Sequence, residues 1–358
     1  MEKKLMLTDA NVLMRENIRK MKKYSSARSE YSGKAAVFLD ANENSLGSPA
    51  GLDLNRYPDP MQIILKERIS ILKSVPAKNI FLGNGSDEAI DNLIRVFCEP
   101  GKDRVMISSP TYGMYKVAAD TNNVEVLDVP LKNNFQLDVD AMISVADKVK
   151  MIFICSPNNP SGNRFRREDI VKILKNVSCM TVIDEAYIDF AAAESFTCDI
   201  EKYPGLAVMQ TFSKAWGLAG ARLGLTFAQE PLIDVMNKIK YPYNVNDLTA
   251  RAALTALDNV EERDRMLSQI LSERDRLVVF FEKCDLVHNI YPSDANFLLI
   301  RVENASVMYN ELLRRGIVVR NRSNLTHCTN CLRVTVGTSE ENRRLMSALN
   351  SMSREMTK

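Results

Sequence analysis

The 358-residue chain has few of the features that mark several common protein classes. It holds two histidines, one tryptophan and seven scattered cysteines, and its formal net charge is only +2. So small a charge gives no field that would attract nucleic acid. An odd, scattered set of cysteines does not make the disulfide framework of a small secreted protein. We therefore expect reduced, structural cysteines and no nucleic-acid partner.

Long apolar runs are also missing. None reaches the about 18 to 20 residues that a membrane helix needs, so no membrane contact is expected. The N-terminus, MEKKLMLTDANVLMREN, carries charges but lacks the apolar centre of a signal peptide. A cytoplasmic location is therefore predicted.

Potential metal ligands are too few for a zinc site. Cys328 and Cys331 form a single C-x-x-C next to His327, and the only other histidine is His288. Structural zinc sites require four cysteine or histidine ligands at defined spacings. The sequence therefore predicts no metal and leaves the role of the cysteine pair open.

Short runs rich in valine and isoleucine recur through the middle of the chain and alternate with helical patterns. They lie at 105–107, 124–129, 151–155, 180–183, 207–209 and 223–227. Most lack apolar–polar alternation, which is typical of strands buried on both faces, so a mainly parallel α/β sheet is predicted. A further strand is expected at 80–83, followed by a helix that Ser86 caps.

The two ends of the chain show a different pattern. Helices are expected at 9–30, 61–74, 247–283, 306–315 and 340–352, and strands at 36–39, 297–302, 317–320 and 332–336. This predicts a large α/β domain at 58–244. Residues 1–57 and 245–358 are expected to form a smaller α+β domain.

The strongest chemical signal lies between residues 180 and 224. A buried strand is expected to deliver Asp184 and Tyr187 at its end, and Ser213, Lys214 and Arg222 follow in a glycine-rich stretch. Open α/β sheets bind ligands at the carboxyl ends of their strands. A lysine, a carboxylate, a phenol and a serine–arginine pair suit a phosphorylated aromatic aldehyde.

Three other stretches follow predicted strands. The sequence SPNNPSG occupies 156–162, PTYGMY occupies 110–115, and GNGSDE occupies 83–88. Taken singly, each is typical of an ordinary turn or helix cap. A glycine-led helix start also presents free N–H groups to a phosphate.

Together these motifs resemble, in order and over nearly the whole chain, the pyridoxal-phosphate-dependent aminotransferases of fold type I, class II subfamily. The segments DANEN at 40–44 and LNRYPDP at 54–60, with GNGSDE, resemble the histidinol-phosphate aminotransferase family in particular. Two departures occur: Ser45 replaces the usual proline, and Ser161 the usual threonine.

The resemblance implies pyridoxal 5'-phosphate as cofactor, carried on Lys214. It implies that Asp184 meets the ring nitrogen, that Tyr187 and Asn159 meet the ring oxygen, and that Tyr112 stacks on the ring. The implied phosphate ligands are Gly85, Ser86, Ser213 and Arg222, with Tyr57 reaching across from the other subunit, and Asp87 is a further implied cofactor-binding residue. The family pattern therefore implies a homodimer with shared active sites.

The implied substrate-binding residues are Tyr24, Asn42, Glu43, Arg320 and Arg333. Arg333 lies in CLRVTVGT and matches the arginine that binds the substrate carboxylate in the family. Arg320 is the candidate for the substrate phosphate, and Arg322 competes with it, because strand alternation would point both to one face.

The implied reaction transfers the amino group of L-glutamate to imidazole-acetol phosphate, giving L-histidinol phosphate and 2-oxoglutarate in histidine biosynthesis. Three alternatives stay open. They are an aminotransferase for aromatic or other amino acids, a lyase such as a phosphothreonine decarboxylase, and a non-enzymatic cofactor-binding domain used in regulation.

Overall fold

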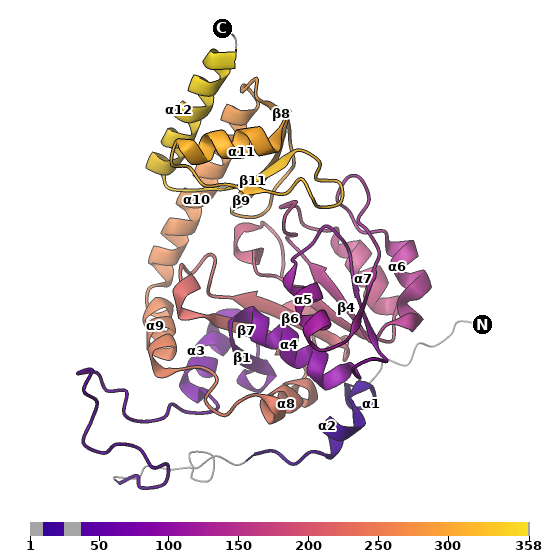
Figure 1. Cartoon of the computed structure of the whole chain (residues 1–358). Coiled ribbons are helices and arrows are strands. Elements are labelled where there is room, and N and C mark those ends of the chain that lie inside the picture. Colours follow the sequence, from indigo (N-terminus) through magenta and orange to yellow (C-terminus); the bar gives the residue numbers. More distant parts are fainter. Residues whose placement is uncertain (1–9, 25–36, 357–358) are drawn as a thin grey trace.

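The computed structural model describes residues 10–24 and 37–356, which fold around two separate sheets (Figure 1). The larger sheet contains β1 (Ile80–Asn84), β2 (Arg104–Ile107), β3 (Glu125–Asp128), β4 (Met151–Cys155), β5 (Met180–Asp184), β6 (Leu206–Thr211) and β7 (Leu223–Ala228). The smaller sheet contains β8 (Val287–Ile290), β9 (Phe297–Val302), β10 (Arg320–Asn321) and β11 (Cys331–Thr335).

The larger sheet has the strand order β1-β7-β6-β5-β4-β2-β3. Strands β3, β2, β4, β5 and β6 run parallel to one another, and β7 runs antiparallel to both β6 and β1. Strands β4 to β7 are buried along their whole length, which explains why their sequences do not alternate. The prediction of a mainly parallel α/β sheet is confirmed.

Helices cover both faces of this sheet. The described helices are α1 (Ala10–Leu13), α2 (Glu16–Lys20), α3 (Ile63–Lys73), α4 (Gly85–Phe97), α5 (Met114–Thr121), α6 (Val139–Val145), α7 (Arg167–Asn176), α8 (Glu230–Ile239), α9 (Asp247–Leu257), α10 (Val260–Phe281), α11 (Ala305–Arg314) and α12 (Ser339–Met356). One hydrophobic cluster joins the sheet to α4, α5 and α8, and a second joins it to α3, α6, α7 and α9. Along β4, Phe153 packs into the first cluster and Ile152 and Ile154 into the second, as strand alternation requires.

The smaller sheet is antiparallel, in the order β10-β11-β9-β8. Its apolar face packs with α10, α11 and α12 in a third cluster. In Figure 1 the long helix α10 runs from the edge of the larger sheet up to the smaller one. The division at 58–244 stays a prediction, and the two sheets lie on either side of its C-terminal boundary.

Three predicted elements differ from the structure in the N-terminal region and near residue 258. Of the helix expected at 9–30, the described part forms two short helices, and 25–30 lies outside the described residues. Residues 37–39 form no strand. The helix expected at 247–283 breaks between α9 and α10, where Asn259 leaves helical geometry and its side chain donates to the Thr255 carbonyl at 2.7 Å. Asparagine side chains compete with the helix backbone in this way.

Two further predictions are wrong in detail. The strand expected at 317–320 begins only at Arg320. Helix α4 begins at Gly85, so Ser86 lies inside its first turn and is not the N-cap. The positive φ of Gly85 (75°), which is accessible to glycine, turns the chain from β1 directly into the helix. Within the described residues, no helix is both long and apolar enough to cross a membrane.

Candidate active site

A cavity opens at the carboxyl ends of β4, β5 and β6, beside the start of α4. It is lined by Ser86, Asp87, Tyr112, Cys155, Asn159, Asp184, Ala186, Tyr187, Thr211, Ser213, Lys214 and Arg222. Of the cofactor residues expected from the sequence, only Gly85 and Tyr57 are absent from this lining. Parallel strands bring residues far apart in the chain to one sheet edge, which is where open α/β sheets bind ligands.

Asp184 forms the floor of the cavity and is only 3% exposed. Its Oδ2 accepts a hydrogen bond from the Tyr115 hydroxyl at 2.6 Å, and its Oδ1 accepts one from the Ala186 N–H at 3.0 Å. Burial raises the pKa of Asp184, and these two donors oppose that rise because they stabilise the charged form. Sequence reasoning missed Tyr115, since its position on α5 follows the apolar pattern of a core residue.

Lys214 lies in the turn after β6, and its side chain is exposed within the open cavity. Its Nζ lies 5.5 Å from the centre of the Tyr187 ring. The pKa of Lys214 is lowered, first by the surrounding protein, which removes water from the ammonium, and then by the positive charge of Arg333. A lysine with a lowered pKa provides a neutral amine nearer to neutral pH.

Close packing between β7 and the start of α4 forms a cradle for an anion. A Cβ on Gly224 would lie 2.4 Å from the Ser86 nitrogen, and one on Gly85 would lie 2.5 Å from Arg222 Nη2. Glycine at both positions therefore lets the Arg222 guanidinium reach the N-terminus of α4, where it also pairs with Asp87 at 3.2 Å. A guanidinium beside a helix N-terminus suits a phosphate.

Two tyrosines and an asparagine line the middle of the cavity. The Tyr112 hydroxyl donates to Asp87 Oδ1 at 3.1 Å, and the Tyr187 ring packs edge-on against Phe297. Burial raises the pKa of both phenols, so both remain neutral hydrogen-bond donors. The buried Asn159 accepts a hydrogen bond from Arg333 through its Oδ1 at 2.5 Å.

Three arginines of the smaller sheet form a group of uncompensated positive charge. Arg320 and Arg333 are directly opposite each other in the β10–β11 ladder, so their side chains project from one face. None of Arg320, Arg322 and Arg333 forms an ion pair with any described residue. The pKa of Arg322 is lowered by burial and by the charges of Arg333 and Arg320. Such a group is suited to bind an anionic ligand.

Four expected site residues lie away from this cavity within the single chain. Tyr24 and Asn42 are exposed, and the Glu43 carboxylate accepts the Tyr57 N–H at 2.6 Å. The Tyr57 ring stacks on Tyr243, with ring centres 4.4 Å apart. In Figure 1 the described segment that leads into α3 extends as an arm beside the body of the chain.

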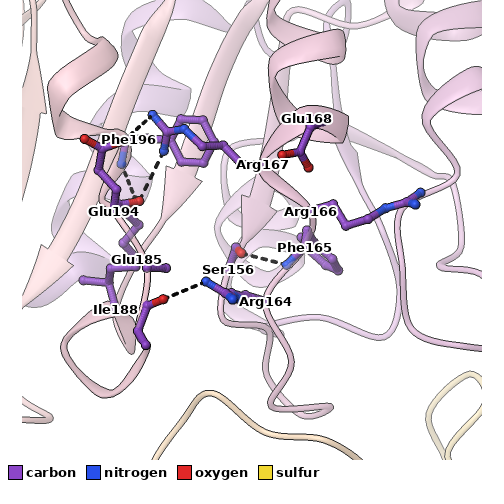
Figure 2. Close-up of a pocket in the computed structure, with 12 residues that line it drawn as sticks. Ser156, Arg164, Phe165, Arg166, Arg167, Glu168, Glu185, Ile188, Glu194 and Phe196 are labelled. Carbon is purple, nitrogen blue, oxygen red and sulfur yellow. Dashed lines mark hydrogen bonds and ion pairs between the residues drawn. The ribbon is translucent and has the colours of Figure 1, made fainter.

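A second cavity lies on the other side of β5, next to Glu185 (Figure 2). Asp184 and Glu185 are consecutive, so their carboxylates face opposite sides of the sheet. The buried Glu185 carboxylate is already satisfied by the Ser195 hydroxyl, the Phe196 N–H and the Gln210 amide. This cavity has no lysine in its lining, and Arg164 and Arg167 at its rim are bonded to neighbouring carbonyls. It therefore lacks the groups needed for the predicted chemistry.

Cys328 and Cys331 are both buried, and the Cys331 thiol donates to the Thr329 carbonyl at 3.6 Å. Across residues 10–24 and 37–356, no group of three or more histidine, cysteine, aspartate or glutamate side chains is placed to hold a metal ion.

Comparison with known proteins agrees with this geometry. The family model "Aminotransferase class I and II" matches residues 30–349. The chain therefore belongs to the class I and II aminotransferases. Its curated relatives include the histidinol-phosphate aminotransferases of Parabacteroides distasonis, 53% identical over 97% of this chain and 99% of the relative, and Bacteroides thetaiotaomicron, 52% identical over 94% and 97%.

Solved structures share the fold. The histidinol-phosphate aminotransferase of Clostridium acetobutylicum is 26% identical, with a TM-score of 0.79 over 84% of this chain and 92% of that one. The L-threonine-O-3-phosphate decarboxylase of Porphyromonas gingivalis has the same fold at 22% identity, with a TM-score of 0.72 over 84% and 91%. That likeness extends to the fold alone.

The cofactor of this family is pyridoxal 5'-phosphate, and the cavity fits it. The cradle between Arg222 and the start of α4 fits the phosphate. The buried, hydrogen-bonded Asp184 fits a protonated ring nitrogen, and Lys214 offers the amine that an aldehyde requires.

The lowered pKa of Lys214 predicts its reactivity in the cofactor-free protein. When the chain is labelled with an amine-reactive reagent at increasing pH, Lys214 should react at a lower pH than Lys78. The pKa of Lys78 is raised by its hydrogen bond and ion pair with Glu230, which makes it a matched control. Peptide mass spectrometry measures both sites in one sample. Equal pH midpoints for the two lysines would contradict this assignment.

Proposed function

We propose that this chain is a histidinol-phosphate aminotransferase that transfers the amino group of L-glutamate to imidazole-acetol phosphate. The products are L-histidinol phosphate and 2-oxoglutarate. The observation that carries the proposal is the group of three unpaired arginines on the smaller sheet, next to a cavity that fits the cofactor. The two substrates differ in size and share anionic groups, which such a cluster is suited to bind.

The cofactor, when bound, supplies an aldehyde for the amino group and an aromatic ring that withdraws electrons from the reacting carbon. Asp184 holds a proton at the ring nitrogen, because a buried carboxylate stabilises an adjacent positive charge. Tyr187 and Asn159 hydrogen-bond the ring oxygen, and Tyr112 covers the ring face. These roles keep the ring in one orientation relative to Lys214.

Lys214 acts as the base that moves the proton at the reacting carbon. Its lowered pKa supports this role, since a general base works best when its pKa is near the working pH. The glycine, serines and arginine of the cradle anchor the phosphate end: Gly85, Ser86, Ser213 and Arg222. Asp87 orients Arg222 and Tyr112 at the cofactor through its ion pair and its hydrogen bond.

The arginines divide the work of substrate recognition. Arg333 donates to Asn159 at the cavity, which supports a role for its guanidinium in binding the α-carboxylate of glutamate. Arg320 projects from the same face and binds the phosphate of the second substrate or the distal carboxylate of glutamate. Tyr24, which lies away from the cavity within one chain, would join this site from the N-terminal segment of the second copy. Arg322 competes for the phosphate role. Asn42 and Glu43 complete the substrate site from the N-terminal segment.

We further propose a homodimer in which the N-terminal segment crosses to a second copy. Large apolar side chains are exposed along this segment, including Leu39 (84%) and Leu46 (98%). Such exposure is unfavourable unless another surface covers it. Tyr57 and the neighbouring Asn42 and Glu43 would then contribute to the partner's cavity, which explains why they lie outside their own.

The function is tested by assaying the purified chain with L-glutamate and imidazole-acetol phosphate. The wild type should form histidinol phosphate, and Lys214→Ala should reduce the rate by at least about 10²-fold, the usual contribution of a general base. Aromatic amino donors and O-phosphothreonine serve as competing substrates. Faster turnover of either, or release of carbon dioxide from phosphothreonine, would favour an aromatic aminotransferase or a decarboxylase.

Substitution of the arginines separates the two half-reactions. Arg333→Ala should slow the reaction with glutamate roughly 10- to 150-fold, the worth of one charge-assisted hydrogen bond, and affect histidinol phosphate much less, because that donor has no carboxylate. Arg320→Ala should impair both. The exposed Arg314, paired with Glu311 on α11, is the control. Single-turnover spectra with each donor measure the rates. Equal losses for both donors in Arg333→Ala would overturn the division, and a phosphate defect only in Arg322→Ala would move that role to Arg322.

Mixing two inactive variants tests the shared site. Lys214→Ala and Tyr57→Ala, dissociated and reassembled together, should recover part of the wild-type activity. Each mixed dimer then contains one cavity with an intact Lys214 and an intact Tyr57 from the other copy. Either variant reassembled alone should stay inactive. A fully active monomer in sedimentation experiments would refute the arrangement.

A further inference from the structure

Tyr115 is a buried residue to which the reaction described above gives no role. It is fully buried on α5, and its ring stacks on Phe153 of β4, with centres 4.7 Å apart and planes 7° apart. Its hydroxyl donates to Asp184 Oδ2 at 2.6 Å. A phenylalanine would fill the same stacked position. The buried hydroxyl therefore has one evident purpose, which is its bond to the carboxylate.

The neighbours of Asp184 show why this bond is needed. Burial is the largest influence on Asp184 and disfavours its charged form, and the negative charge of Asp87 acts in the same direction. Tyr115 is the first opposing influence, followed by the Ala186 N–H and then the positive charge of Lys214. The two hydrogen-bond donors thus favour the charged form of the carboxylate against the effect of burial.

The remaining titratable neighbours do not replace Tyr115. Cys155 is opposite Asp184 in the β4–β5 ladder, but its thiol donates to the Pro157 carbonyl at 3.4 Å. The Tyr112 hydroxyl is committed to Asp87. Tyr187 faces Lys214 and Phe297. Burial and the negative charge of Asp184 raise the pKa of Tyr115 itself, so its hydroxyl keeps its proton and remains a donor.

We propose that Tyr115 is a positioning residue, whose hydroxyl fixes the Asp184 carboxylate beneath the cofactor ring and supports its charged form. The bond occupies Oδ2 from the α5 side, while the Ala186 N–H holds Oδ1. With both oxygens held, the carboxylate cannot rotate away from the cavity. This inference rests on the role given to Asp184 in the proposed function.

The test follows the protonation of Asp184 in the cofactor-free protein by infrared spectroscopy. The carbonyl band of a protonated carboxylic acid is assigned to Asp184 by its loss in Asp184→Asn, and its intensity is measured against pH. In Tyr115→Phe the midpoint should rise by about 1 to 2 pH units, because a donor to the charged form is lost. Tyr203→Phe, which removes the hydroxyl of a half-buried tyrosine packed against another cluster, should leave the midpoint unchanged.

A second variant keeps the shape of the side chain. A difluorinated tyrosine at position 115 is a stronger donor, so the Asp184 midpoint should fall below that of the wild type. In the cofactor-loaded enzyme, Tyr115→Phe should lower kcat about tenfold or more and leave KM nearly unchanged, since the hydroxyl does not touch the substrate. An unchanged midpoint in both Tyr115 variants would overturn the proposal.

The two proposals fail separately. A shifted midpoint in a protein that does not aminate imidazole-acetol phosphate would contradict only the proposed function. Normal amination together with an unmoved Asp184 midpoint would contradict only the role of Tyr115.

Discussion

The site depends on one buried charge. Asp184 is almost completely enclosed at the end of β5, and an isolated carboxylate at such a depth is strongly disfavoured. The structure offsets this cost with a phenol from α5 and a backbone N–H from the turn that follows the strand. The position of the Tyr115 side chain, between Phe153 of β4 and Asp184 of β5, is therefore as much a part of the chemistry as Lys214. The helices on the α5 side of the sheet therefore contribute to the reaction in addition to forming the hydrophobic core.

The arginines of the smaller sheet differ from Asp184 in that their charges are not compensated. Each arginine of β10 and β11 is left without an acidic partner among the described residues, and Arg333 is held by the neutral amide of Asn159 and by the ring of Phe297. A carboxylate in that position would neutralise the cation and compete with the substrate. One site thus combines a carboxylate whose oxygens are already hydrogen-bonded with arginines that have no acidic partner among the described residues. The charge that attracts an anionic ligand comes from the arginines.

Much of this arrangement follows from the sequence, and its gaps have physical causes. The unalternating strands 151–155 and 180–183 predicted the buried sheet, and their ends predicted where Asn159 and Asp184 would gather. Element boundaries were less accurate, because Asn259 and Gly85 act through local backbone geometry that a hydrophobic pattern does not contain. Tyr115 was missed because the hydrophobic pattern of a helix shows that a tyrosine is buried, but does not show whether its hydroxyl donates to a carboxylate. The role of Tyr57 could be predicted only from the resemblance to the family, because the cavity that it is expected to reach belongs to a second copy of the chain.

The two consecutive carboxylates at the end of β5 require this strand to keep its number of residues. Asp184 faces the cofactor cavity and Glu185 faces the network of Ser195, Phe196 and Gln210 on the other side of the sheet. Successive strand residues point to opposite faces, so losing one residue from β5 would move Glu185 into the place of Asp184 and turn Asp184 to the other face. A glutamate would then meet the ring, and Ala186 would take the place of Glu185 in the network behind the sheet. Substitutions within β5 can be absorbed by repacking, whereas insertions and deletions there disrupt both faces at once.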